Sequence, residues 1–166
     1  NKFRFIKFHG NITKKKEVDT WIKKNEFDVI LHFAAIVPTD LVNKNYSKAR
    51  KVNFIGTKYL VDSILKNKKK IKWFFFASTS HVYPVQPGKI KENFKTNPSS
   101  KYGKTKLLAE NYVRKKFKNL NFCIGRIFSI IDNKGKGFLA SSLKKKLKKT
   151  SKLIFLENLN HYRDFI

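Results

Sequence analysis

The chain contains three short, almost continuous apolar runs, and they are separated by segments with helical periodicity. The runs are Val29–Phe33, Trp73–Ala77 and Asn121–Ile127. A run of this length that is apolar on both faces is typical of a strand covered on both sides, as in a parallel sheet. The runs therefore predict three buried strands.

Alternating and amphipathic patterns predict the elements around these strands. Residues Phe3–Phe8 alternate apolar and basic side chains, which predicts an additional strand. Apolar residues recur at helical spacing over 14–25, 46–66 and 99–118. Thr13 stands where the first helix would need an N-cap. These segments predict three helices, and each of them precedes one of the three apolar runs.

The remainder of the chain continues the alternation. The proline-rich segment 82–98 predicts an irregular loop, and 132–137 predicts a glycine-rich turn. A basic helix over 138–149 and a strand over 152–156 are expected after it. Strands that alternate with helices indicate an α/β fold with a parallel sheet. Ligands of such sheets bind at the carboxyl ends of the strands, so we expect the site there.

Composition narrows the classes of function. The formal charge is +27, yet only five of the 38 basic residues are arginine. Recognition of bases and phosphates favours arginine, so biased composition explains the lysine better than nucleic-acid binding does. No apolar run approaches the roughly 20 residues of a membrane span. The single cysteine, Cys123, excludes an internal disulfide and a cysteine-built metal site, and its apolar neighbours predict a buried thiol in a cytoplasmic protein.

Tyr102 and Lys106 are the strongest candidates for chemistry. Their spacing of four places both side chains on one face of the predicted helix, one turn apart. A cation beside a phenol favours the phenolate and lowers the phenol's pKa from about 10. Such a tyrosine exchanges a proton with an alcohol or a carbonyl group. Tyrosine and lysine also occur at this spacing by chance in many helices. The rest of the chain therefore decides whether this pair is catalytic.

Six segments along the chain resemble, in order, the motifs of the extended short-chain dehydrogenase/reductase family, the NAD-dependent epimerases and dehydratases of sugar nucleotides. The fourth of them is the YxxxK signature. The six segments are 28–35, 52–57, 77–83, 102–106, 126–128 and 163–166. The resemblance implies a Rossmann-like, doubly wound sheet. It also implies a nucleotide-sugar substrate and hydride transfer through NAD or NADP.

The resemblance also implies roles for single residues. Tyr102 would be the general acid/base, Lys106 would lower its pKa and bind the nicotinamide ribose, and Thr79 would hold the reacting oxygen. Asn53 would support the site. The full set of implied cofactor-binding residues is Asn11, Ile12, Phe33, Ala34, Ala35, Asn53, Tyr102 and Lys106. The implied substrate-binding residues are Thr79, Ser80, Ser129 and Arg163.

Departures from the family's pattern restrict the reaction. Dehydratases of the family place a carboxylate just before the Val-Tyr pair, where this chain has Ser80 and His81. Neither side chain is a carboxylate, so dehydration is disfavoured, and epimerisation and keto-sugar reduction stay open. Asn11 replaces the usual aspartate that meets the adenine, and Ser129 replaces a common asparagine.

The family's glycine-rich turn is absent ahead of the first predicted strand. We therefore expect residues 1–166 to be an incomplete cofactor-binding domain, clipped at both ends, with the substrate-binding portion beginning at about 129 and with weak cofactor binding of its own. A homodimer through the helices of Asn53 and Tyr102 is a further implication of the resemblance. The alternative is a nucleotide- or RNA-associated protein that keeps the fold without catalysis. The joint presence of Thr79, Tyr102 and Lys106 argues against that alternative.

Overall fold

The computed structural model describes residues 4–37, 39–86 and 88–129 of the chain. Contacts divide the chain into two units, Asn1–Arg126 and Ile127–Ile166, and all but three of the described residues belong to the first. The predicted helix over 138–149, the strand over 152–156 and Arg163 lie outside the described residues.

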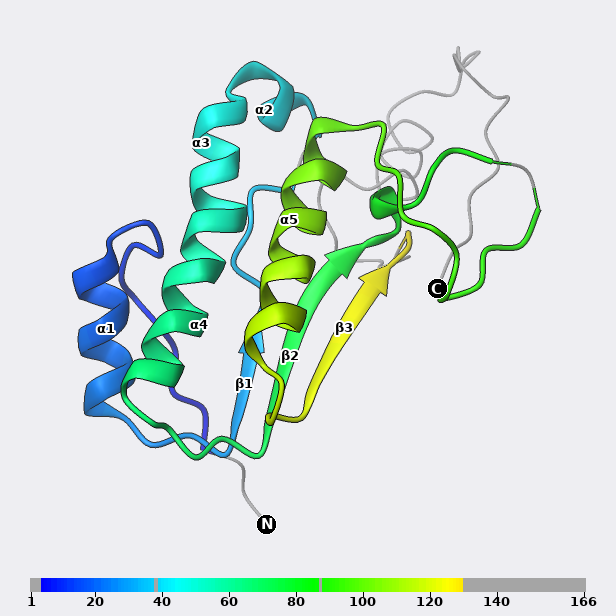
Figure 1. Cartoon of the computed structure of the whole chain (residues 1–166). Coiled ribbons are helices and arrows are strands. Elements are labelled where there is room, and N and C mark those ends of the chain that lie inside the picture. The colour runs from blue at the N-terminus through cyan, green and yellow to red at the C-terminus, as the bar shows by residue number, and fades with distance from the viewer. Residues whose placement is uncertain (1–3, 38, 87, 130–166) are drawn as a thin grey trace, which may run out of the picture. The chain divides into compact units, whose positions relative to one another are not determined.

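The first unit is built on a three-stranded sheet of order β1-β2-β3. The strands are β1 (Val29–His32), β2 (Trp73–Thr79) and β3 (Phe122–Ile127). β1 and β2 are parallel, with Val29 opposite Trp73 and His32 opposite Phe76. Figure 1 shows the three arrows pointing in the same direction. The predicted α/β fold with a parallel sheet is therefore confirmed.

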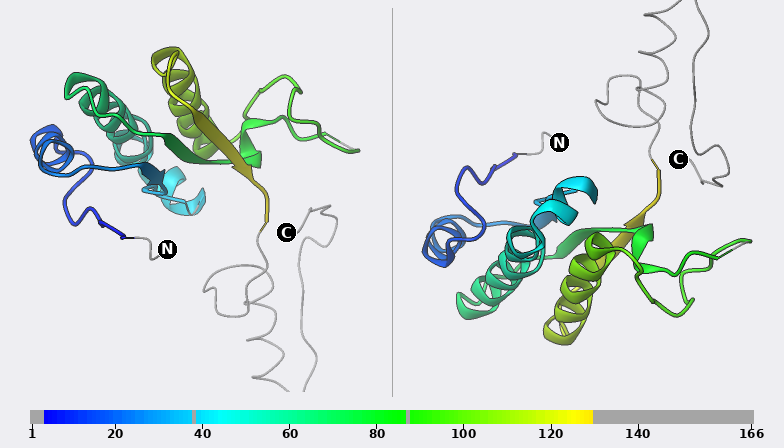
Figure 2. Two further views of the ribbon diagram at one scale, coloured as in Figure 1. Left: turned by 90° about the horizontal axis from the view of Figure 1, so that it is seen from below. Right: turned by 90° about the horizontal axis from the view of Figure 1, so that it is seen from above.

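Helices connect the strands and lie on one side of the sheet (Figures 1 and 2). Helix α1 (Lys15–Lys24) precedes β1, α4 (Thr57–Lys66) precedes β2, and α5 (Lys101–Lys116) precedes β3. α1 packs against α4, and α4 packs against α5. The core between helices and sheet is apolar, and its most buried large side chains include Ile22, Val61, Phe74, Phe76 and Phe117.

The segment between β1 and α4 is helical but not uniform. It comprises α2 (Thr39–Lys44), α3 (Tyr46–Arg50) and a π-helical turn, η1 (Lys51–Gly56), that runs directly into α4. The predicted helix over 46–66 is thus confirmed in extent, with one wide turn inside it. Wide turns of this kind are rare and often occur at functional sites. Asn53 lies in this one.

Three predictions are wrong: the strand near the N-terminus, the cap of α1 and the burial of the cysteine. Residues 4–8 form no strand, because no described strand pairs with their backbone. Thr13 does not cap α1; its backbone N–H and its hydroxyl both donate to Asn11 Oδ1, and Lys14 is the residue at the cap. Cys123 is exposed, because its neighbours Phe122 and Ile124 in β3 pack against the core and alternation turns the residue between them away from it.

The expectation that the strands are covered on both faces of the sheet also needs correction. β1 and β2 are not covered on both sides in the described part of the chain. Val29 and Leu31 are 46% and 48% exposed, while Ile30 and His32, which alternate with them, are buried. The strands are apolar on both faces, as predicted, and the described helices cover one face.

No helix in the described part of the chain combines the length and apolar character that crossing a bilayer requires.

Candidate active site

The carboxyl end of β2 brings Thr79 to the start of α5. The strand ends at Thr79 and turns at once into a short 3₁₀ helix, η2 (Ser80–Val82), which lies at the tip of the β2 arrow in Figure 1. The Thr79 hydroxyl caps this turn by accepting from the His81 backbone N–H at 3.3 Å. Capping this turn is therefore one role of the Thr79 hydroxyl.

Helix α5 begins with a regular cap, and this fixes Tyr102 and Lys106. The Ser100 hydroxyl accepts from the Gly103 N–H at 3.0 Å, so the helix starts at Lys101. Tyr102 and Lys106 then follow on one face, and both side chains are buried. The predicted pair is confirmed as a pair of neighbours on one helix.

Gly103 allows α5 to approach the η2 turn. A β-carbon at this position would lie 2.1 Å from the carbonyl oxygen of His81 and 2.8 Å from its carbonyl carbon. Any side chain would therefore push the helix away from the turn. This contact keeps Tyr102 next to the end of β2, where Thr79 lies.

The phenol of Tyr102 contacts Thr79. Burial raises the pKa of Tyr102, and a side-chain hydrogen bond with Thr79 opposes that rise. A hydroxyl that lowers the pKa of a phenol does so by donating to the phenolate. The edge of the His81 ring also packs on the Tyr102 ring, with centroids 5.7 Å apart.

The expected electrostatic effect of Lys106 on Tyr102 is not found. The pKa of Tyr102 is raised, not lowered, and Lys106 is not among its causes in the described structure. Instead, the ammonium lies 4.2 Å from the centre of the Phe76 ring. Burial lowers the pKa of Lys106 from 10.5 to about 8, and the nearby carboxylate of Glu110 opposes the shift. The two side chains share a face of the helix, but burial dominates the titration of both.

Asn53 ties the loop after β1 to α5. Its Oδ1 accepts from the Ile36 N–H at 2.7 Å, and its Nδ2 donates to the Ile36 carbonyl and to the Thr105 hydroxyl, both at 3.0 Å. The Thr105 hydroxyl in turn donates to the Tyr102 carbonyl at 2.8 Å. The amide of Asn53 is thus used by protein groups, which matches the supporting role that the motif implies. Sequence reasoning did not identify Thr105, whose role depends on its contact with Asn53.

His32 extends this network to β1. Its Nε2 lies 2.8 Å from the Thr57 hydroxyl, and that hydroxyl donates to the Asn53 carbonyl at 2.8 Å. Burial, together with the charge of Lys106, lowers the pKa of His32 to about 3. His32 is therefore neutral at physiological pH and acts as a hydrogen-bonding group of the core.

The other predicted cofactor residues lie in two loops, one after β1 and one before α1. Phe33 is 59% exposed, and Ala34 follows it on the surface. Ile12 packs against Gly56, since a β-carbon on that glycine would lie 2.8 Å from its side chain. Asn11 is exposed, but its Oδ1 is already engaged by Thr13.

The substrate residues are only partly described. Ser80 is half-buried in η2, close in sequence to Thr79. Ser129 is half-buried and belongs to the second unit, and Arg163 lies outside the described residues.

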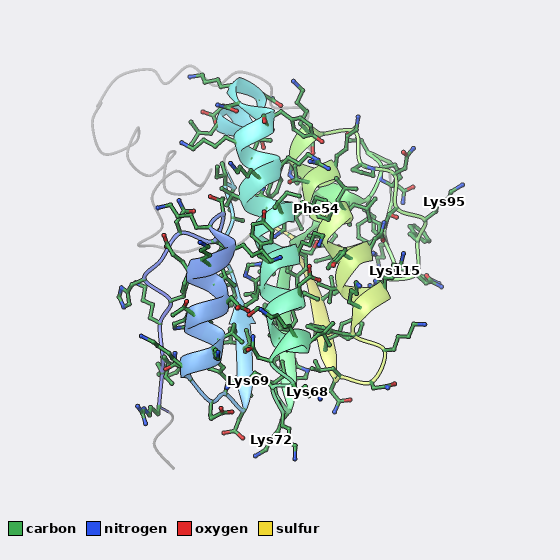
Figure 3. All side chains as sticks on the ribbon, turned by 60° about the vertical axis from the view of Figure 1, so that its left-hand side comes forward. Phe54, Lys68, Lys69, Lys72, Lys95 and Lys115 are labelled. Carbon is green, nitrogen blue, oxygen red and sulfur yellow. The ribbon has the colours of Figure 1, made fainter. Side chains whose placement is uncertain are left out.

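The lysine cluster before β2 lies away from these residues. Figure 3 shows Lys68, Lys69 and Lys72 together at the end of the sheet where the strands begin. Lys69 and Lys72 pair there with Glu26 and Asp28. Thr79 ends the same strand that Lys72 precedes, so this part of the positive charge does not line the candidate site.

The buried ammonium of Lys106 provides a test of whether a dinucleotide fits. It is 1% exposed, and it lies over the Phe76 ring with the Glu110 carboxylate nearby. Burial disfavours its charged form, so a ligand with hydroxyl oxygens beside it would stabilise the ammonium. Ala34 and Ala35, which follow β1, carry small side chains, and Ala34 is exposed. The residues present fit the ribose of a nicotinamide cofactor.

Comparisons with known proteins agree with this fit. The model of the NAD dependent epimerase/dehydratase family matches residues 3–166. The chain is 31% identical over 107 residues to UDP-glucose 4-epimerase of Pisum sativum, covering 63% of the chain and 30% of that protein. It is 30% identical over 159 residues to GDP-6-deoxy-D-talose 4-dehydrogenase of Aggregatibacter actinomycetemcomitans, covering 94% of the chain and 53% of that protein.

A solved structure shows a similar fold. The UDP-glucuronic acid 4-epimerase of Bacillus cereus, solved in complex with UDP-glucuronic acid and NAD, matches with a TM-score of 0.61 and 27% identity. The match covers 69% of this chain and 36% of that one. The chain thus spans between about a third and about a half of the length of these relatives.

Proposed function

The chain belongs to the NAD-dependent epimerase/dehydratase family, and we propose that it forms part of an enzyme that epimerises a sugar nucleotide or reduces its keto form. The observation that supports the proposal is the side-chain hydrogen bond between Tyr102 and Thr79 at the end of β2, with the buried Lys106 one turn later on α5. A module that only binds nucleotides has no physical need for a buried phenol in contact with a hydroxyl. The alternative of a non-catalytic RNA-associated protein is therefore not favoured.

Tyr102 acts on the proton of the sugar. Its phenolate oxygen takes the proton from the reacting hydroxyl, and its phenol returns a proton to the keto oxygen. The Thr79 hydroxyl, which already meets the phenol, holds the same sugar oxygen in line. NAD, when bound, supplies the hydride chemistry. Since burial raises the pKa of Tyr102, a cation close to the phenol is needed for proton uptake near neutral pH.

Lys106 is that cation in the proposal. Its ammonium binds a ribose hydroxyl of the dinucleotide and is thereby held near Tyr102. Phe33, Ala34 and Ala35 line the approach, and Asn11 and Ile12 flank the adenine end. Asn53 positions α5 through Thr105 rather than touching the cofactor, because its amide bonds are already made.

Dehydration is the reaction that the site supports least. Ser80 and His81 occupy the turn after Thr79, and neither carries a carboxylate that could abstract a carbon-bound proton. Epimerisation and reduction need only the Tyr102 proton and a hydride. The substrate-binding portion from about residue 129, with Ser129 and Arg163, completes the proposed enzyme, and a homodimer is its proposed assembly.

The experiment is a substrate panel. The full-length protein is incubated with UDP-, GDP- and dTDP-sugars in the presence of NAD or NADP, and separately with their 4-keto forms in the presence of NADH or NADPH; products are separated by chromatography. We expect a change of configuration at a single sugar carbon, or reduction of a supplied 4-keto sugar with loss of the 340 nm absorbance. A 4-keto-6-deoxy product from an unmodified sugar would show dehydration and would refute the assignment. Absence of any conversion, with intact fold, would refute the proposal as a whole.

A further inference from the structure

Glu110 is a fully buried carboxylate that the proposed mechanism does not use. It is 0% exposed and lies on α5 two turns after Tyr102 and one turn after Lys106. Burying a charged carboxylate costs several kcal/mol unless charges and donors surround it. The groups that surround Glu110 therefore indicate which parts of the structure this carboxylate holds together.

Both oxygens of Glu110 are occupied. Arg126 at the end of β3 donates from Nε to Oε1 and Oε2, each at 3.2 Å, and from Nη2 to Oε2 at 2.8 Å. The Ser78 hydroxyl donates to Oε1. Ser78 directly precedes Thr79, so the carboxylate fixes the residue next to the proposed substrate-holding hydroxyl.

The other arm of Arg126 reaches the loop after η2. Its Nη1 donates to the Tyr83 hydroxyl at 2.8 Å and to the Glu92 carbonyl at 3.1 Å. The guanidinium carbon also lies 4.7 Å from the centre of the Tyr83 ring. Through Arg126, Glu110 is thus connected to both ends of the segment from Tyr83 to Glu92.

Glu110 also balances the charge of Lys106. The groups that face Lys106 come from three elements: neutral His32 from β1, the Phe76 ring from β2, and Glu110 from α5 itself. Among these described groups Glu110 is the negative charge. Arg126 on β3 competes for it through the bonds described above.

We propose that Glu110 is a positioning residue of the active site, which holds the Ser78–Thr79 strand end and the Tyr83–Glu92 loop in register with Tyr102 and Lys106. This inference rests on the proposed function, because its purpose is to align the proton-transferring groups. The arrangement joins three elements with one carboxylate: β2 through Ser78, β3 through Arg126, and α5 through its own backbone.

Two substitutions test the proposal, one that removes a negative charge and one that removes a positive charge. Glu110→Gln removes the negative charge with little change of shape, and Arg126→Met removes its positive partner. The titration of Lys106 is measured on the full-length protein without substrate or cofactor, from the pH dependence of its acetylation by acetic anhydride, resolved by peptide mass spectrometry. Glu26→Gln is the control, because Glu26 is an exposed carboxylate that pairs with Lys69.

The two variants should shift the titration of Lys106 in opposite directions. In Glu110→Gln the midpoint should fall by about one pH unit, because the balancing charge is lost. In Arg126→Met it should rise, because the carboxylate is no longer shared. Glu26→Gln should leave it unchanged. A Lys106 midpoint that moves in neither variant would show that Glu110 is not the charge that faces Lys106, and that result would overturn the proposal, as would two shifts of the same sign.

Turnover provides the second measurement. With the substrate found in the panel above, Glu110→Gln should lower kcat by about tenfold or more, with KM within about threefold, since misaligned groups reduce the rate more than the affinity. An unchanged kcat would overturn the positioning role. If Glu110→Gln does not fold, Arg126→Lys decides instead: we expect a lower kcat, because a lysine cannot reach Glu110, Tyr83 and Glu92 together. The acetylation measurement needs no activity, so it can fail or succeed independently of the proposed function.

Discussion

Gly103→Ala should separate the two halves of the candidate site. The new methyl carbon would lie 2.1 Å from the His81 carbonyl oxygen and 3.0 Å from the β-carbon of Pro98. Carbon and oxygen atoms in contact stay more than about 3 Å apart, so the helix start and the η2 turn must move apart by about 1 Å. Because the obstacle is backbone, no rotamer change can relieve it.

The magnitude follows from two opposing effects. Overpacking costs about 1–3 kcal/mol, and alanine in place of glycine inside a helix returns about 0.5–1 kcal/mol. We expect a net loss of roughly 1–2 kcal/mol in the free energy of unfolding. The effect on the reaction should be larger, since a displacement of about 1 Å between Thr79 and Tyr102 can cost about 100-fold in kcat.

Urea unfolding and steady-state kinetics measure the two effects on the full-length protein. Lys104→Ala is the matched control, because Lys104 is the next residue of α5 and is exposed. The control should keep both the stability and kcat of the parent. If Gly103→Ala is as stable and as active as Lys104→Ala, then α5 and η2 are not held together as described, and the account of how Tyr102 meets Thr79 is refuted.

Three further predictions concern the buried polar groups. Asn53→Ala leaves the Ile36 N–H and carbonyl without their partner and should cost about 3 kcal/mol of stability in urea unfolding; a loss below about 1 kcal/mol would show that the clamp is dispensable. His32, whose pKa is lowered to about 3 mainly by burial, stays neutral in the fold while the unfolded chain protonates below pH 6.5, so stability present above pH 6.5 should fall by about 2 kcal/mol by pH 5. His32→Gln should lose that part of the acid sensitivity, and an unchanged slope of stability against pH would contradict the assignment. Lys106 has a pKa of about 8, so kcat/KM should decline as pH rises through about 8, and a profile flat to pH 10 would show that the ammonium is not required.

Local patterns were enough to predict the main elements. The helical periodicity over 14–25 is confirmed by α1, whose Val18 and Ile22 are buried, and the three apolar runs correspond to the three strands. Tyr102 and Lys106 could be placed on one helix face because the cap at Ser100 and the helical spacing are both local features. The meeting of Thr79 with Tyr102 could be predicted because strand ends share one edge in a parallel sheet.

Interactions between distant residues could not be predicted in this way. The π-helical turn at Asn53 depends on contacts with Ile36 and Thr105, which are 17 and 52 residues away. The pairing of Glu110 with Arg126 leaves no trace in either residue's local pattern. The pKa of Tyr102 was wrongly expected to fall, because the spacing of Lys106 is visible in the sequence and the burial of the phenol is not.

The most direct test of the central claim is the substitution Tyr102→Phe in the full-length protein. It removes the phenol oxygen and leaves the ring that packs against His81. Turnover of the sugar nucleotide identified in the panel, and binding of the same compound by calorimetry, are measured together. We predict a loss of about 100-fold or more in kcat, with the dissociation constant within about threefold of the parent value. Turnover at the parent rate would contradict the assignment of Tyr102 as the group that transfers the proton.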